Sequence, residues 1–359
     1  MTFSNLKESD EQKLLESKEN AADIHEKEPA KVSTHAYLKF VLKKAVFYVI
    51  AFFIAVSLTY VLPRLLPDPI ERLLPTCQSC PTDPNWLARR ASLEAYFGID
   101  RPVWESLLNF WANFFKLDFG PSLLYYPRPA AEIVAAALPY TLMIVIPALI
   151  ISFIVGNWMG TKIGFSKNWK NTLGYYLLIG LQSVPFYWMA LVFLDGGVRI
   201  GMFDLSPRPG FTWETSFTLL RYAVLPFFAL LVCTTGGWAT GMRAMTIYEM
   251  NSGYILYCEK LGFRKYKLQN IVQRNAILPQ FTGLNLRLSE FIGATLVLEQ
   301  VLYWPGIGNL MINAFTANDY PLIMATFFIT ILIVLIGNFM IDIAYGFLDP
   351  RIKTGSEGG

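Results

Sequence analysis

The sequence predicts an all-α integral membrane protein with six transmembrane helices. Of its 359 residues, 54% are hydrophobic and only 16% are charged, whereas about a quarter of the residues of a soluble domain are charged. Six stretches are long and apolar enough to cross a bilayer core of about 30 Å, which needs roughly 20 helical residues. This composition excludes a disordered, collagen-like or disulfide-rich secreted chain. The net charge of +3 gives no indication of nucleic-acid binding.

Residues 1–35 form a charged tail ahead of the first span. The tail carries eight acidic residues and five lysines but almost no β-branched or aromatic residues, so it cannot bury enough apolar surface to fold alone. We expect a solvated, disordered tail; a helix that docks on a partner is the alternative, and no specific pattern supports it. Both histidines, His25 and His35, lie here. Their position excludes Ser–His hydrolases and His-rich metal sites from the membrane body.

The predicted spans divide the rest of the chain. The first helix covers 36–62, with an uncharged stretch from residue 45, and 63–132 is a long connection. A five-helix core at 133–353 and a short C-terminal tail at 354–359 follow. The core spans lie in residues 133–161, 171–194, 222–242, 278–298 and 322–347. Hydropathy alone does not establish the fifth span of the chain, 278–298, because it contains Arg287 and Glu290.

Lysine and arginine in the short loops predict the orientation, since such loops are enriched in these residues on the cytoplasmic side. Lys39, Lys43 and Lys44 precede the first span, and Lys162, Lys167 and Lys170 fill the loop after the second. Six basic residues against two acidic ones follow the fourth span, whereas 63–132 and 195–220 are balanced or acidic. Both termini and the two basic loops are therefore predicted to be cytoplasmic.

The connection 63–132 is then external. It is too polar to span the membrane, and it contains an amphipathic run at 103–117. The connection also carries several large aromatic side chains, Trp86, Trp104, Trp111 and Phe115. We expect a small helical cap on the membrane surface, because tryptophan and other aromatic residues favour that interface. A solvated spacer is the alternative.

Residues 243–279 form the most informative cytoplasmic segment. A helical period brings Ile247, Met250, Tyr254, Leu256 and Tyr257 to one face, and Gly262 is placed as the residue that ends this helix. A second short basic helix at 266–276 and Pro279, at the start of the fifth span, follow. The pattern fits docking into a groove of another protein. It fits an amphipathic hairpin on lipid headgroups equally well.

A family resemblance decides between these two interpretations. Residues 40–353 resemble the permeases of ABC importers, in the dipeptide/oligopeptide/nickel branch. The coupling loop of that family is matched by Glu249, Tyr254-Ile255, Gly262 and Arg274-Asn275-Ala276-Ile277-Leu278-Pro279. Further matches, in order along the chain, are Asp118-Phe119-Gly120-Pro121-Ser122, Leu138-Pro139-Tyr140-Thr141, Ser183-Val184-Pro185, Trp304-Pro305-Gly306-Ile307-Gly308 and Asp319-Tyr320-Pro321. The chain departs from the family pattern at Leu256-Tyr257-Cys258.

The resemblance implies a type I ABC-importer permease fold in the cell membrane. It implies a complex with a second homologous permease, two ATP-binding subunits and an extracytoplasmic substrate-binding protein. ATP and magnesium would bind the ATPase subunits, because this chain has no G-x-x-x-x-G-K-[ST] loop, and no cofactor is expected on the chain itself. The implied cargo is di- or oligopeptides, with oligosaccharides or a nickel chelate as alternatives. The residues expected to couple to the ATPase are Glu249, Tyr254, Tyr257, Cys258, Glu259, Gly262, Phe263, Arg264, Asn275 and Pro279.

Charged residues within the spans are candidates for the pathway. Arg287 and Glu290 are three residues apart and share a helix face. They either line the translocation pathway, together with Ser183, or neutralise each other against a neighbouring helix; the sequence slightly favours neutralisation. A secondary transporter that couples ions through Arg287, Glu290 and Asp342 is the alternative from another class, but the chain shows no inverted repeat.

Two further patterns concern cysteine and glycine. Cys77 and Cys80 lie in the predicted external segment, where a disulfide is favoured over free thiols and no further ligand completes a metal site. In the fourth span, Gly237-x-x-x-Gly241 is typical of close helix packing.

Overall fold

The computed structural model describes residues 34–61, 84–97, 102–166, 168–199 and 213–348. Within these ranges the chain is helical, and its only β-bridge pairs Pro121 with Pro129. Residues 1–33 of the predicted tail 1–35, the predicted tail 354–359 and the Cys77–Cys80 pair lie outside the described residues, and Thr34 and His35 belong to the first described helix.

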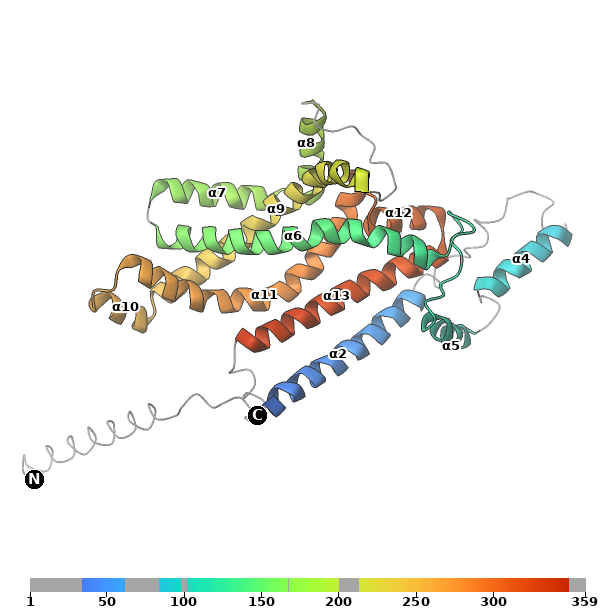
Figure 1. Ribbon diagram of the computed structural model, residues 1–359, viewed down its shortest axis with the longest axis horizontal. Coiled ribbons are helices and arrows are strands. Elements are labelled where there is room, and N and C mark those ends of the chain that lie inside the picture. Colours follow the sequence, from blue (N-terminus) through green and yellow to red (C-terminus); the bar gives the residue numbers. More distant parts are fainter. Residues whose placement is uncertain (1–33, 62–83, 98–101, 167, 200–212, 349–359) are drawn as a thin grey trace, which may run out of the picture.

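Eleven helices make up the described chain, and the long ones run along one direction of an elongated bundle (Figure 1). Their bounds are α2 (Thr34–Val61), α4 (Pro84–Phe97), α5 (Val103–Phe114), α6 (Ala130–Phe165), α7 (Trp169–Ser183), α8 (Phe186–Arg199), α9 (Trp213–Met250), α10 (Gly253–Lys260), α11 (Lys265–Val301), α12 (Ile307–Ala317) and α13 (Tyr320–Leu348). We name the two ends of the bundle by a short helix at each. The α10 end also holds the α6–α7 connection, the start of α2 and the end of α13, and the α12 end holds α5 and the start of α6.

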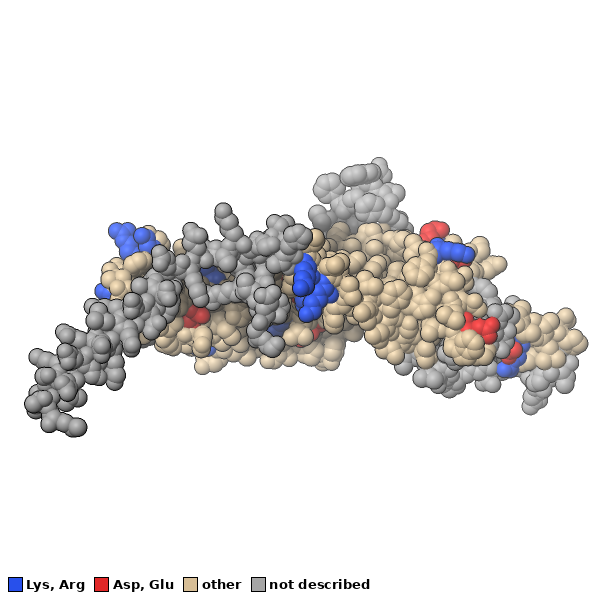
Figure 2. All heavy atoms as spheres, turned by 90° about the horizontal axis from the view of Figure 1, so that it is seen from below, with Lys and Arg blue, Asp and Glu red and all other residues tan. Residues whose placement is uncertain are grey.

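Among the described residues, four helices are long and apolar enough to cross a membrane: Tyr37–Val61, Ala130–Phe165, Tyr222–Met250 and Tyr320–Gly346. They contain the predicted first, second, fourth and sixth spans. In Figure 2 a band without acidic or basic residues separates charged groups near the two ends, on the part of this face that grey atoms leave visible. This distribution suits a bundle whose middle lies in hydrocarbon.

The predicted third span, 171–194, is not one straight helix. The pair Trp169–Ser183 and Phe186–Arg199 is bent by 100°, and counts as a fifth span only if both halves are taken together. Val184 is extended (φ −78°, ψ 126°), because the ring of a following proline disfavours the helical conformation of the residue before it.

The predicted fifth span lies in α11, which is long enough but too polar to be recognised as a span. The short helix expected at 266–276 does not exist separately. α11 runs without interruption from Lys265 to Val301, with Pro279 in its interior. Its buried positions include the polar residues Gln280, Thr295 and Glu299, and these lower its mean hydropathy. α11 nevertheless lies within the bundle, because it packs against α6, α8, α9, α12 and α13.

Helices α6 and α9 form the closest contact of the bundle through three glycines of α6. A Cβ on Gly156 would overlap Trp238, one on Gly160 would overlap the carbonyl oxygen of Ala239, and one on Gly164 would lie 2.8 Å from Thr246 Cβ. Helices in lipid associate mainly by close packing, and small residues permit it. The three glycines therefore set the distance between α6 and α9.

Glycines of α9 itself face two other helices. A Cβ on Gly236 would lie 2.6 Å from the carbonyl oxygen of Leu178 in α7, and one on Gly237 would lie 2.8 Å from Arg287 Nη1 in α11. The side chain of Gln280 in α11 lies against Gly241, 3.1 Å from such a position. The close packing predicted for Gly237 and Gly241 is confirmed within this chain, and α9 lies between α6, α7 and α11.

A buried glutamate holds α12 in place. The Glu299 side chain accepts hydrogen bonds from Thr141 Oγ1 (2.7 Å) and from the backbone N–H of Gly308 (2.6 Å). Trp304 Nε1 donates to the carbonyl oxygen of Tyr140 (3.1 Å). A Cβ on Gly306 would overlap the Glu299 carboxylate. The carboxylate thus binds the first turn of α12, where free N–H groups favour a negative charge.

A second buried carboxylate, that of Asp319, lies between α12 and α13. It accepts hydrogen bonds from Ser122 Oγ and from the N–H groups of Leu124 (2.9 Å) and Leu322 (3.2 Å). It therefore fixes the loop before α6 to the start of α13.

The amphipathic run predicted at 103–117 forms α5, Val103–Phe114, which packs on α2. Tyr60 stacks on Phe110 with ring centroids 4.5 Å apart, and its hydroxyl donates to the carbonyl oxygen of Ser106 (3.0 Å). The ring centroids of Trp111 and Phe53 are 4.7 Å apart. Trp104 and Phe115 are 66% and 71% exposed, and the Phe115 ring lies with its centroid 6.4 Å from that of Phe53 in α2.

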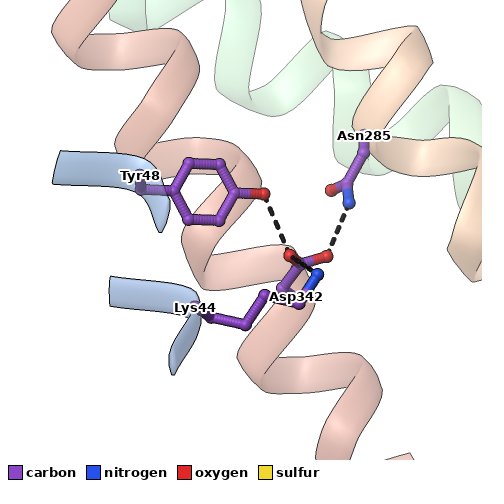
Figure 3. A network of polar contacts seen from close by, with 4 residues as sticks. All are labelled: Lys44, Tyr48, Asn285 and Asp342. Carbon is purple, nitrogen blue, oxygen red and sulfur yellow. Dashed lines mark hydrogen bonds and ion pairs between the residues drawn. The ribbon is translucent and has the colours of Figure 1, made fainter. Parts of the chain in front are cut away.

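Asp342 joins three helices near the α10 end (Figure 3). It forms an ion pair with Lys44 of α2 (Nζ–Oδ2, 2.8 Å) and accepts hydrogen bonds from Tyr48 of α2 (2.9 Å) and Asn285 of α11 (2.7 Å). Helix α2 packs only on α13 and α5 among the described helices. Because apolar surface gives no drive for helix association in lipid, these polar contacts help hold α2 to the bundle.

The α6–α9 packing predicts a contrast between two glycines. Replacing Gly160 with alanine should lower the free energy of unfolding in detergent by about 1–3 kcal/mol, because the added methyl group overlaps backbone. Gly174→Ala in α7, where a Cβ meets nothing within 4 Å, should be neutral or slightly stabilising. Equal melting temperatures for the two variants would contradict this packing.

The Asp342 network predicts an energetic coupling between α2 and α13. A double-mutant cycle with Lys44→Met and Asp342→Asn should give an interaction energy of about 1 kcal/mol, as for polar pairs between membrane helices. Thermal unfolding of the purified protein measures it. Lys43→Met, at the adjacent exposed lysine, is the matched control, and a Lys44→Met effect no larger than the control would show that the pair does not stabilise the bundle.

Candidate coupling surface and membrane-depth charge pair

The α10 end carries a compact turn between α9 and α11. The prediction of a single helix before Gly262 is wrong. α9 ends at Met250, and Asn251 and Ser252 form a turn before α10. Of the five residues expected to share an apolar face, Ile247, Tyr254, Leu256 and Tyr257 are exposed and Met250 is half-buried. The buried residue of α10 is Ile255, which is not one of the five. The turn occurs where Ser252 Oγ donates to the Glu249 carbonyl oxygen (2.6 Å), because serine side chains that bind nearby backbone compete with helix continuation.

Gly262 ends α10, as the sequence predicts. Its φ is +81°, in the left-handed region that glycine adopts without steric cost. Its N–H donates to Glu259 O (2.9 Å), and the N–H of Phe263 donates to Cys258 O (3.2 Å). These two bonds are the Schellman arrangement that closes a helix. The following residue, Arg264, directly precedes α11, so Gly262 sets the angle between the two helices.

The hydroxyl of Tyr254 links three helices. It donates to Glu249 at the end of α9 and accepts a hydrogen bond from Asn275 Nδ2 of α11 (2.7 Å). Burial and the Glu249 hydrogen bond raise the pKa of Tyr254 above its ordinary value, so the hydroxyl keeps its proton at neutral pH. The Tyr254 hydroxyl therefore brings together three of the predicted coupling residues, Glu249, Tyr254 and Asn275. The first and last of these are 26 residues apart in the chain.

Around this network lies an exposed surface of apolar and basic side chains, which we call the coupling surface. Its large apolar members are Tyr248, Tyr254, Leu256, Tyr257, Leu261, Phe263 and Tyr266. Its basic members are Lys260, Arg264, Lys265 and Lys267, all exposed. Glu259 is exposed and Cys258 partly so. Contiguous apolar surface of this kind marks an interaction site.

Pro279 does not belong to the coupling surface. It lies 15 residues beyond Arg264 in the continuous helix α11, roughly 22 Å along the helix axis at 1.5 Å per residue. The expectation that it opens a new helix is wrong. The sequence alone does not distinguish a helix start from a proline inside a helix whose neighbours replace the lost hydrogen bond.

Arg287 and Glu290 of α11 lie together at the level of the middle of α9. Arg287 Nη1 and Glu290 Oε2 are 3.6 Å apart, and the side chains are 36% and 65% exposed. The guanidinium lies against Gly237 and 5.4 Å from the centre of the Trp238 ring. A charged residue at the centre of a lipid-facing helix costs about 2.5–3.5 kcal/mol on insertion scales. This face is therefore unsuited to hydrocarbon.

Ser183 does not contact this pair. It ends α7, is exposed, and its hydroxyl donates to Ile179 O of its own helix (2.9 Å). The neighbouring Gln182 lies against Gly236, whereas Arg287 lies against Gly237. Adjacent residues on a helix point about 100° apart, so Gln182 and Arg287 approach α9 from different directions.

Sequence reasoning missed the buried carboxylates Glu299 and Asp319. Each sits next to a matched family segment, before Trp304-Pro305-Gly306 and at the start of Asp319-Tyr320-Pro321. The available signal for a buried carboxylate was an acidic residue next to an apolar segment, because a polar group buried there must find hydrogen-bond partners inside the protein. In the described ranges no three His, Cys, Asp or Glu residues are grouped as metal ligands.

Comparison with known proteins matches these features to one family. Residues 148–354 match the family model of the "Binding-protein-dependent transport system inner membrane component". The chain is 30% identical to the oligopeptide transport system permease protein AppB of Bacillus subtilis, over 74% of this chain and 85% of that protein. It is 25% identical to the dipeptide transport system permease protein DppB of Lactococcus lactis, over 88% of this chain and 99% of that protein.

A third relative is the oligopeptide transport system permease protein OppB of Haemophilus influenzae, 25% identical over 88% of this chain and 99% of that protein. The family model covers both the coupling surface and the charge pair. The chain therefore belongs to the family of inner-membrane components of binding-protein-dependent transport systems.

Proposed function

We propose that this chain is the permease subunit of an ATP-driven importer of di- and oligopeptides. The observation that carries the proposal is the coupling surface, a rigid apolar and basic surface between two membrane helices, in a chain of this family. With a second, homologous permease it forms the pathway for peptides that an extracytoplasmic binding protein delivers. Peptides are proposed because the relatives are named as oligopeptide and dipeptide permeases.

In this proposal the α10 end faces the cytoplasm. Lys39, Lys43 and Lys44 at the start of α2, Lys162 and Lys170 at the α6–α7 connection, and the basic residues of the coupling surface all belong to elements at that end (Figure 1). This distribution agrees with the excess of basic residues in cytoplasmic loops. Both termini are then cytoplasmic, and α4 and α5 lie on the external side.

We propose six membrane crossings, by α2, α6, the bent pair α7–α8, α9, α11 and α13. The crossing by α11 is supported by its length and by its packing against three of the apolar candidate spans, α6, α9 and α13. A helix shielded by protein does not need an apolar exterior on every side.

ATP hydrolysis takes place on two separate subunits in this proposal. Each would receive a coupling surface in a groove, by the helix-in-groove mode. When ATP binding brings the ATPases together, α10 moves with them. Because α9 and α11 continue from the coupling surface into the membrane and are tied there by Tyr254 and Asn275, the motion passes to the pathway as a rigid-body shift.

Purification of the tagged chain from its native membrane in mild detergent tests this function. We expect a second permease and ATPase subunits with phosphate-binding loops to be recovered, identified by mass spectrometry. A detergent shown to preserve a known importer of this type is the control. Recovery of the chain alone under those conditions would contradict the proposal.

Gly262 provides a sharper test of the coupling surface. Gly262→Val should reduce peptide uptake and recovery of the ATPase at least fivefold, because a β-branched residue is strained at a positive φ and would turn α10 away from α11. Membrane insertion and the amount of chain should be unchanged.

The matched control is Gly253→Val at the start of α10, where a Cβ also meets nothing within 4 Å but φ is not positive. Only the backbone conformation distinguishes the two sites. Normal coupled uptake by Gly262→Val would contradict the role of this turn.

A further inference from the structure

The charge pair of α11 lies at membrane depth on an exposed stripe. Gly237 and Trp238, which contact Arg287, are near the middle of the candidate span Tyr222–Met250. The exposed positions of α11 around the pair are Thr282, Leu286, Ser289, Glu290, Gly293 and Val297. They mix polar, small and apolar side chains at helical spacing, and a lipid-facing stripe would be apolar throughout.

The two charges are held differently. The Arg287 guanidinium fits the space left by the missing side chain of Gly237 and lies near the Trp238 ring, a favourable cation–π position. Glu290 projects further, with 65% of its side chain exposed against 36% for Arg287. Their N–O distance of 3.6 Å is longer than the 2.7–2.9 Å of a charge-assisted hydrogen bond. The carboxylate therefore keeps acceptor capacity for another group.

We propose that Glu290 is the group in the translocation pathway that receives the positive charge of a passing substrate, an ammonium or guanidinium. Arg287 is the positioning residue: it lies beside the carboxylate and limits the strength of the interaction between Glu290 and the substrate. A pathway must bind its cargo strongly enough to admit it and weakly enough to release it. This assignment rests on the proposed function, since it requires that the exposed stripe of α11 faces the pathway.

Cysteine labelling tests the assignment without any substrate. Gly293 lies three residues from Glu290 on the same stripe, and a Cβ there meets nothing within 4 Å, so Gly293→Cys can be introduced without overlap. The background is the assembled complex in membranes, with Cys77, Cys80, Cys233 and Cys258 of this chain replaced by serine or alanine. Thiol reagents of similar size, one cationic and one anionic, are added, and the mass of this chain is followed.

We expect the cationic reagent to react about tenfold faster than the anionic one, since a charged cleft concentrates ions of opposite sign by 10-fold or more. Glu290→Gln should bring the ratio of the two rates close to one. Ser289→Ala, at the adjacent exposed residue, should leave it unchanged. No reaction with either reagent, or a ratio insensitive to Glu290→Gln, would overturn the proposal.

Transport links the site to its cargo. In proteoliposomes that contain the whole complex and its binding protein, uptake of an N-acetylated lysine-containing tripeptide is compared with that of its N-acetylated glutamate-containing counterpart, so that the lysine side chain is the only cation in either peptide. Each uptake is divided by the ATP hydrolysis that the same peptide stimulates, which removes differences in capture by the binding protein. Glu290→Gln should lower lysine-peptide uptake about tenfold without lowering glutamate-peptide uptake.

An equal loss for both peptides would indicate a structural role for Glu290 and overturn the proposal. Failure of the wild-type complex to import either peptide, together with the expected labelling ratio, would instead contradict peptides as the cargo. Glu290 would then remain the cation-receiving group for a different substrate.

Discussion

The close contact between α6 and α9 is the constraint on which the rest of the structure depends. Gly156, Gly160 and Gly164 bring the two backbones together, so that α9 can also touch α7 and α11 through its own glycines. A bulky side chain at any of these positions would separate helices that both the coupling surface and the charge pair require. In lipid this precision matters more than apolarity, because hydrocarbon tails solvate leucine as well as a neighbouring helix does.

Three buried or half-buried carboxylates connect the remaining elements. Glu299 binds α12 to α6, Asp319 binds the loop before α6 to α13, and Asp342 binds α2 to α13 and α11. Each carboxylate meets partners that are distant in the sequence. The energetic reason is common to all three: a polar group inside the membrane region is costly unless protein groups satisfy it. The same groups therefore specify which helices are neighbours.

The continuity of α9 and α11 relates the two functional regions to each other. α11 extends from Lys265, next to the coupling surface, past the charge pair to Val301 near α12. α9 accompanies it, and the Tyr254 hydroxyl of α10 ties Glu249 of α9 to Asn275 of α11. A helix transmits displacement along its axis with little deformation, so in the proposed function a shift at the coupling surface would reach Arg287 and Glu290. The bent pair α7–α8 has no such continuity, which makes it a place where the bundle can adjust.

The sequence by itself determined the membrane class, four of the apolar spans, the family and the glycine end of α10. These follow from local chemistry: runs of apolar residues, a glycine at a left-handed position, and family segments in order. It did not determine the break at Val184–Pro185, the uninterrupted α11 or the turn at Asn251–Ser252, because a proline or serine permits either outcome until neighbouring helices supply the missing contacts.

Only the tertiary structure decided which polar groups meet. Glu299, Asp319 and Asp342 find partners up to 298 residues away, and no local pattern contains that information. The unequal exposure of Arg287 and Glu290 likewise depends on Gly237 and Trp238 in another helix. Such contacts arise from the packing of whole helices, which the spacing of residues along one helix cannot specify.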